Sequence, residues 1–181
     1  MINRWNIILI SICIWSLFFI FGVYLGQTSI SCNICIINSE FLELNVVPYS
    51  LDIEYLLTNN IKSIMLNIGG VFIIGLPSIS NLSLNGLIFG LIVETSQMNY
   101  KQIILFTLPH GIFELPALWL AGAAGLKGPQ VFLRYLRGGE FVTRKDVKEY
   151  LTLSALSVVL IVIAAWIEAN ITPKIAERFL Q

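Results

Sequence analysis

The sequence predicts an all-α integral membrane protein, a helical bundle of about five transmembrane helices in a single domain over residues 1–181. Apolar residues make up 56% of the chain and charged residues 12%, whereas about a quarter of the residues of soluble proteins are charged. The apolar residues also gather in runs long enough to cross a bilayer. Acidic and basic residues balance, so no net charge indicates a nucleic-acid partner, and the lipid bilayer is the first partner expected.

The membrane spans are expected at residues 5–26, 61–76, 84–97, 103–125 and 150–169. No small-x-small cleavage site follows the first run, which indicates a retained helix rather than a signal peptide. At helical rise this run reaches roughly 33 Å, enough for the hydrocarbon core. The second and third runs are short, so they are either extended by flanking residues or interrupted. The polar residues 78–83 between them are interpreted as a link.

The charged residues predict the orientation in the cell membrane. The loop over residues 27–60 contains four acidic side chains and no lysine or arginine, whereas the loop over residues 127–150 contains six basic side chains. Cytoplasmic loops carry the excess of lysine and arginine, so the second loop and Arg4 are placed inside. An odd number of spans then leaves the amino terminus in the cytoplasm and the carboxyl terminus outside.

The basic loop is expected to contain an amphipathic elbow at the inner leaflet. Its apolar positions are Val131, Phe132, Tyr135 and Leu136, its basic positions are Arg134 and Arg137, and Gly138 and Gly139 follow. This pattern indicates a short amphipathic helix that the glycines end. Thr143 and Asp146 then have the spacing of a capping box, with aspartate in place of the usual glutamate, which predicts a helix from Arg144 into the last span.

Glycines and prolines predict how the helices pack and bend. Gly86, Gly90 and Glu94 fall at successive steps of four, so a face of small residues allows close helix approach and leads to a carboxylate. Pro109 and Pro116 each remove a backbone donor, so the fourth span should kink, break or begin anew near Pro109. Gly111 belongs to the same set of packing or kink positions. Small residues after these positions, Ala117, Ala121 and Ala124, indicate a face packed against other helices.

Polar side chains are expected to gather in the outer half of the membrane. His110 and Glu114 stand one helical turn apart within an apolar run, and ionisable groups there are functional candidates because their burial is costly. The topology places four more polar residues at similar depth: Asn59, Asn60, Glu94 and Glu168. Two interpretations remain. The residues form a cluster or a cavity that opens outward, or they only join helices by hydrogen bonds, which is the commoner use of such residues.

The motifs predict a protein without enzymatic activity, metal or other cofactor. His110 and Glu114 supply two metal ligands, and Glu94 or Glu168 a third, but the second histidine of the His-Glu-x-x-His motif is missing. No Gly-x-Ser-x-Gly elbow and no phosphate-binding loop occur, so any use of ATP would belong to a partner. Cys32 and Cys35 lack the second pair that zinc requires, and whether they form a disulfide is left open.

The motifs from Leu57 onward resemble the stage II sporulation protein M family. They are Pro109-His110-Gly111-Ile112-Phe113-Glu114-Leu115-Pro116-Ala117, Gly125-Leu126, Asn59-Asn60, Asn85-Gly86-x-x-x-Gly90 and Ile167-Glu168-Ala169-x-Ile171-Thr172-Pro173. The His-Gly-x-x-Glu element with its Gly-Leu end is the most specific of these. The resemblance implies a polytopic membrane subunit of a multiprotein complex.

Within that family, the namesake joins two extracytoplasmic peptidoglycan-degrading proteins during engulfment of the forespore in sporulation. Other members look like subunits of export, maturation or immunity systems for bacteriocins, working with a separate ATPase. The resemblance therefore implies a non-enzymatic scaffold with cell-wall hydrolases as partners, or else a permease-like subunit of a bacteriocin export system. A homo-oligomer is compatible with both.

Overall fold

The computed structural model describes residues 3–31, 53–96, 100–172 and 174, and every element in these ranges is helical. The elements are α1 (Arg4–Ser31), α3 (Ile53–Gly69), the 3-10 turn η1 (Gly70–Ile73), α4 (Leu76–Thr95), α5 (Tyr100–Gly125), α6 (Lys127–Leu136) and α7 (Arg144–Asn170). The expected all-helical class is therefore confirmed. Cys32, Cys35, Pro173 and most of the acidic loop lie outside the described residues.

Three helices are long and apolar enough to cross a membrane by length and composition. They are Arg4–Thr28, Leu76–Thr95 and Arg144–Asn170. These helices support the expectation of a membrane protein, and the count of five spans stays a prediction.

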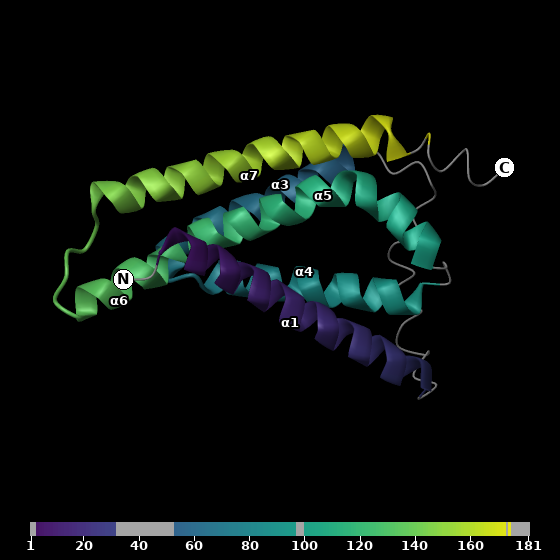
Figure 1. Cartoon of the computed structure of the whole chain (residues 1–181), viewed down its shortest axis with the longest axis horizontal. Helices are drawn as coiled ribbons and strands as arrows, with labels where there is room; N and C mark the ends of the chain where they lie inside the picture. Colours follow the sequence, from purple (N-terminus) through teal and green to yellow (C-terminus); the bar gives the residue numbers. More distant parts are fainter. Residues whose placement is uncertain (1–2, 32–52, 97–99, 173, 175–181) are drawn as a thin grey trace.

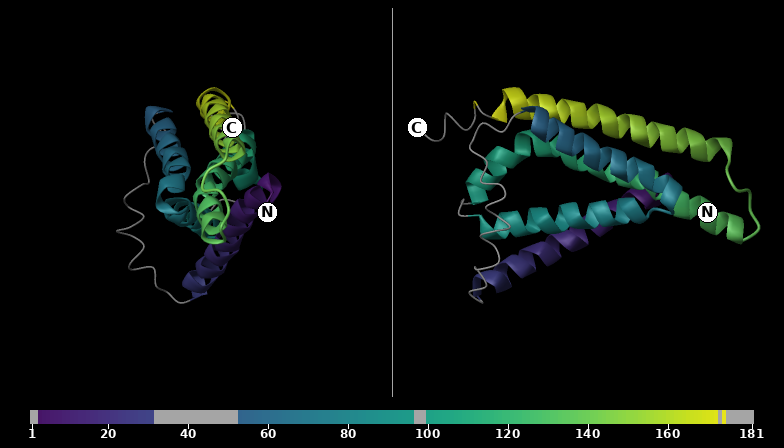
Figure 2. Two further views of the ribbon diagram at one scale, coloured as in Figure 1. Left: turned by 90° about the vertical axis from the view of Figure 1, so that its left-hand side faces the viewer. Right: turned by 180° about the vertical axis from the view of Figure 1, so that it is seen from behind.

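The helices form two packed groups. In one group α1 lies along α4, and in the other α5 lies along α7 with α3 beside them. Figure 1 and the view from behind in Figure 2 show the two groups meeting near the start of α1 and separating toward the opposite end. Polar and apolar residues of both groups line a cavity between them.

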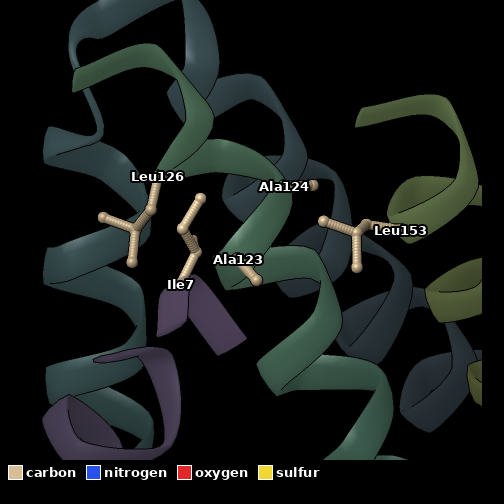
Figure 3. Close-up of a cluster of buried hydrophobic side chains, with 5 residues drawn as sticks. All are labelled: Ile7, Ala123, Ala124, Leu126 and Leu153. Atoms are coloured by element: carbon tan, nitrogen blue, oxygen red, sulfur yellow. The ribbon is translucent and has the colours of Figure 1, made fainter. Parts of the chain in front are cut away.

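Small residues allow the two groups to meet closely. Figure 3 shows the cluster at the junction, in which Ala123 and Ala124 of α5 lie with Ile7 of α1 and Leu153 of α7. Alanine keeps the side-chain layer thin, so the backbones of three helices approach one another. Nearby, the hydroxyl of the fully buried Ser11 donates a hydrogen bond of 2.8 Å to the carbonyl of Trp119.

The expected link over residues 78–83 is wrong, because these residues belong to α4. The chain turns earlier, at Ile74 and Gly75, which have φ of 49° and 76°. Pro77 follows in the first turn of α4, where its missing N–H costs no helical hydrogen bond. The helix can then continue through the polar residues, because those that are buried find partners on α3.

The fourth span was expected to kink, break or begin anew near Pro109, and of these outcomes the break and the new start are wrong. Helix α5 continues from Tyr100 to Gly125 with Pro109 and Pro116 inside it. Its ribbon curves in Figure 1, and the assignment of a kink to Pro109 stays a prediction.

The loop between α5 and α7 contains the expected short helix, and the expected capping box begins α7. Helix α6 ends at Leu136, and Gly138 with φ of 78° provides the turn that follows. The Thr143 side chain accepts a hydrogen bond from the Asp146 amide, and the Asp146 side chain accepts one from the Thr143 amide, which completes the capping box of α7. In Figure 1, α6 points away from the ends of α1 and α4 rather than crossing beneath them.

Candidate functional site

A cavity of about 250 Å³ lies between the two groups of helices. Five helices contribute to its wall, namely α1, α3, α4, α5 and α7. Its polar lining residues are Asn60, Ser63, Asn85, Thr107, His110 and Glu114, and its apolar ones include Trp15, Ile64, Phe89, Leu118 and Ile161. The wall is therefore mostly apolar with a few polar groups, which is the usual composition of a binding site.

His110 and Glu114 lie side by side on the α5 wall of the cavity. His110 Nε2 is 3.9 Å from Glu114 Oε2, and the two side chains are 15% and 33% exposed. This separation exceeds that of a hydrogen bond, so the pair is close without being bonded. The other imidazole nitrogen of His110, Nδ1, is enclosed and has no hydrogen-bond partner among the described residues.

The structure brings together only part of the expected polar cluster. Asn60, His110 and Glu114 line the same cavity. Glu168 does not line it. Asn59 is exposed, and Glu94 lies beside Gly26 of α1, at the interface between α1 and α4.

Sequence reasoning missed a polar ladder between α3 and α4 that forms the adjoining wall. The Asn81 amide donates to the carbonyl and hydroxyl oxygens of Ser63, at 3.1 Å and 2.8 Å. The Asn85 amide donates to Asn81 Oδ1 at 3.0 Å and to Ser63 Oγ at 3.3 Å. The signal for this ladder was the i, i+4 spacing of the two asparagines, which places both on one helical face.

A second polar contact lies where α5 crosses the turn between α3 and α4. The Ser78 hydroxyl donates a hydrogen bond of 2.7 Å to the Asn67 carbonyl. A Cβ atom on Gly125 would lie 1.9 Å from Ser78 Oγ and 2.1 Å from that carbonyl oxygen. Only glycine therefore fits at this position, because any side chain would displace the hydrogen bond.

The donor set at the cavity does not match a metal centre. Within residues 3–31, 53–96, 100–172 and 174, no three His, Cys, Asp or Glu side chains converge. His110 and Glu114 thus offer two ligands, whereas a structural zinc site takes four and a catalytic one takes three.

Charged residues gather at the other end of the molecule. Arg134 donates to both carboxylate oxygens of Asp146, at 2.6 Å and 3.2 Å, and to the carbonyls of Glu140 and Phe141. The hydrogen bond from its guanidinium to Asp146 raises the pKa of Arg134. Lys127, buried at the start of α6, pairs with Glu149 of α7. These ion pairs connect α6 to the first turns of α7.

The family model for stage II sporulation protein M matches residues 11–173, which cover all or most of each of the five helices around the cavity. The chain belongs to the stage II sporulation protein M family. The predicted resemblance is thereby confirmed, and it extends over the first helix as well as the later motifs.

Two relatives in the archaeon Methanocaldococcus jannaschii are uncharacterized proteins. One is 37% identical over 178 residues, which cover 96% of this chain and 97% of the relative. The other is 32% identical over 123 residues, 66% of this chain and 55% of that relative. No solved structure matches the chain. Membership of the stage II sporulation protein M family therefore indicates a membrane protein, and the finer role is a matter of proposal.

Proposed function

We propose that the chain is a non-enzymatic, five-span membrane subunit that holds partner proteins together at the cell envelope. In this arrangement α3 and α5 also cross the bilayer. Apolar side chains at steps of four on α5, Ile104, Leu108 and Ile112, are more than half exposed, as are Met65 and Leu66 on α3. Such a stripe suits lipid contact. The charge distribution favours a cytoplasmic amino terminus and an external carboxyl terminus.

The small volume of the cavity favours a scaffold over a permease. Its volume of about 250 Å³ is below the roughly 300–1,000 Å³ of typical small-molecule sites. This space accommodates a few water molecules or one large side chain from a partner, but not a folded or extended peptide. A membrane helix of a partner that inserts one side chain therefore fits better than a transported peptide.

The polar wall supplies the chemistry for such a contact. His110 Nδ1 has no partner among the described residues, and Glu114 is partly exposed to the cavity. Polar groups within a bilayer gain stability when another helix offers a hydrogen bond. Partner helices with a polar side chain at the depth of His110 are therefore the ligands that we propose. Cell-wall hydrolases as partners, a role in sporulation and a homo-oligomer come from the resemblance and stay predictions.

The separation of the two helix groups favours a second candidate. The groups diverge toward one end (Figure 1), so further opening would enlarge the cavity. A permease-like subunit of a bacteriocin export system with a separate ATPase would use such a motion. Neighbouring genes discriminate cheaply between the candidates: cell-wall hydrolase genes favour the scaffold, and an ATPase gene beside a small peptide precursor favours the permease.

Site-specific photo-crosslinking in native membranes tests the scaffold. A benzoylphenylalanine at Thr107, which lines the cavity, should form an adduct with another membrane protein. The same probe at the lipid-exposed Leu108 is the matched control and should not form one. Glu114→Ala should lower recovery of the partner about 3- to 15-fold, the value of one interhelical hydrogen bond. Adducts with a small peptide would select the permease, and equal protein adducts from both positions would contradict a specific contact at the cavity.

A further inference from the structure

A second and larger cavity lies at the end of the molecule where α1 begins. Its volume is about 630 Å³, within the roughly 300–1,000 Å³ range of small-molecule sites. The start of α1, the helix α6 with the turn after it, and the first turns of α7 form its wall. Figure 1 shows the start of α1, the helix α6 and the connection from α6 to α7 at the same end of the molecule.

Basic side chains outnumber acidic ones in this cavity. The lining cations are Arg4, Lys127, Arg134, Arg137 and Lys145, and the lining acids are Glu140, Asp146 and Glu149. Two of the acids are already neutralised, because Lys127 pairs with Glu149 and Arg134 pairs with Asp146. Three cations then remain against one acid, so the cavity attracts an anion.

The remaining cations differ in how tightly the protein holds them. Lys145 Nζ lies 4.0 Å from Glu149 Oε1, at the limit of an ion pair, and its side chain is 70% exposed. Arg137 is exposed and takes part in no ion pair within the described ranges. Both side chains are therefore able to turn toward a ligand without breaking the pairs that hold α6 to α7.

The depth of the cavity matches that of lipid headgroups. Arg4 directly precedes the apolar run that begins at Trp5. Lys145 stands five residues before Tyr150, where the last apolar run begins, or about 7.5 Å at helical rise. The headgroup layer on each side of the hydrocarbon is about 5–8 Å thick. Leu133 lines the same cavity and is half-exposed, so an apolar surface for the glycerol and acyl region adjoins the cations.

We propose that this basic cavity binds the phosphate headgroup of an anionic phospholipid in the cytoplasmic leaflet. Basic pockets at the cytoplasmic ends of membrane helices recognise such headgroups. The phosphate would contact Arg4 of α1 together with Arg137 and Lys145, so one lipid bridges α1, the turn after α6, and α7. The inference rests on the membrane placement proposed above, but it concerns a separate site and needs no protein partner.

Lipid titration of the purified full chain in detergent, followed by native mass spectrometry, tests the proposal. Phosphatidylglycerol is compared with phosphatidylcholine of the same acyl chains. The test variant is Arg137→Gln/Lys145→Gln. The matched control is Arg144→Gln/Lys148→Gln, which removes the same charge from residues that line a different surface of α7. Circular dichroism checks that both variants remain helical.

The wild type should bind phosphatidylglycerol more tightly than phosphatidylcholine. The test variant should weaken phosphatidylglycerol binding about 25-fold, roughly fivefold for each cation, and the control by less than about threefold. Equal binding of the two lipids, or equal losses in the two variants, would overturn the proposal. Displacement of the lipid by an equal concentration of inorganic phosphate would also overturn it, because the ligand would then be a free phosphate. Each of these outcomes is independent of whether the photo-crosslinking experiment finds a protein partner.

Discussion

Alanine at Gly86 or Gly90 should force apart α1 and α4. These glycines lie where α4 contacts the α1 backbone directly. A Cβ on Gly86 would lie 2.3 Å from the Trp15 carbonyl oxygen, and a Cβ on Gly90 would lie 2.2 Å from the Phe19 carbonyl oxygen. Because the neighbouring atoms belong to backbone, no side chain can rotate away, and the helices must separate instead.

The cost follows from this geometry. Ordinary Cβ contacts are 3.4 Å or longer, so each substitution requires a shift of about 1 Å. Overpacking of this kind costs about 1–3 kcal/mol. Replacing a helical glycine by alanine returns up to about 1 kcal/mol through helix propensity. We therefore expect a net loss of about 1–2 kcal/mol for each variant, and less than the sum for the double variant, because one separation relieves both contacts.

Thermal unfolding of the purified chain in detergent, followed by helical circular dichroism, measures this loss. At about 2–4 °C per kcal/mol for a chain of this size, Gly86→Ala and Gly90→Ala should each lower Tm by several degrees. Gly111→Ala is the control, because its Cβ would lie 3.4 Å from Thr107 Cγ2, an ordinary contact. It should leave Tm unchanged or raise it. Tm values for Gly86→Ala and Gly90→Ala at or above that of Gly111→Ala would refute the backbone contact between α1 and α4.

Two further substitutions test side-chain hydrogen bonds by the same measurement. Ser78→Ala removes the donor to the Asn67 carbonyl and should cost about 1 kcal/mol or more, whereas Ser80→Ala on the exposed side of α4 should cost nothing measurable; equal effects would contradict the buried contact. Thr143→Ala removes the cap of α7 and should cost about 0.5–2 kcal/mol. Thr152→Ala removes only a hydrogen bond to the Lys148 carbonyl within the same helix and should be near neutral. An effect at Thr143 no larger than that at Thr152 would contradict a stabilising cap.

Local patterns in the sequence predicted the elements whose cause is local. The capping box needs only Thr143 and Asp146 three residues apart, and the structure contains both of its hydrogen bonds. The amphipathic helix α6 was likewise evident from its residue pattern, and its end from Gly138. These features depend on residues within one or two helical turns, so they can be predicted from the sequence alone.

The start of α4 was not predicted, because its helix depends on distant partners. Ser78 and Asn81 are buried polar residues that would favour a turn if left unpaired. In the fold, the carbonyl of Asn67 and the backbone and side chain of Ser63 satisfy them. The cost of burying polar groups is thereby offset by hydrogen bonds to α3. A polar stretch beside a proline is thus compatible with a helix whenever a neighbouring helix offers acceptors.

Depth in the membrane does not determine which polar residues lie together, as Glu94 shows. Topology placed Glu94 at the depth of His110, but depth gives no information on which side of a helix a residue lies. The step of four that relates Glu94 to Gly86 and Gly90 places all three on the same face of α4. Since that face packs on α1, Glu94 also points toward α1, where it lies beside Gly26.

The cavity uses a different face of α4, formed by Asn85, Phe89 and Ile92. Steps of four and three connect these residues, and the face that they form is turned by about 100° from the glycine face. Because the structure shows that the face of Gly86 and Gly90 packs on α1, the same step of four places Glu94 outside the group around His110. Asn85 lies on the cavity face of α4 and lines the cavity with His110, although the sequence analysis did not include it in the polar cluster.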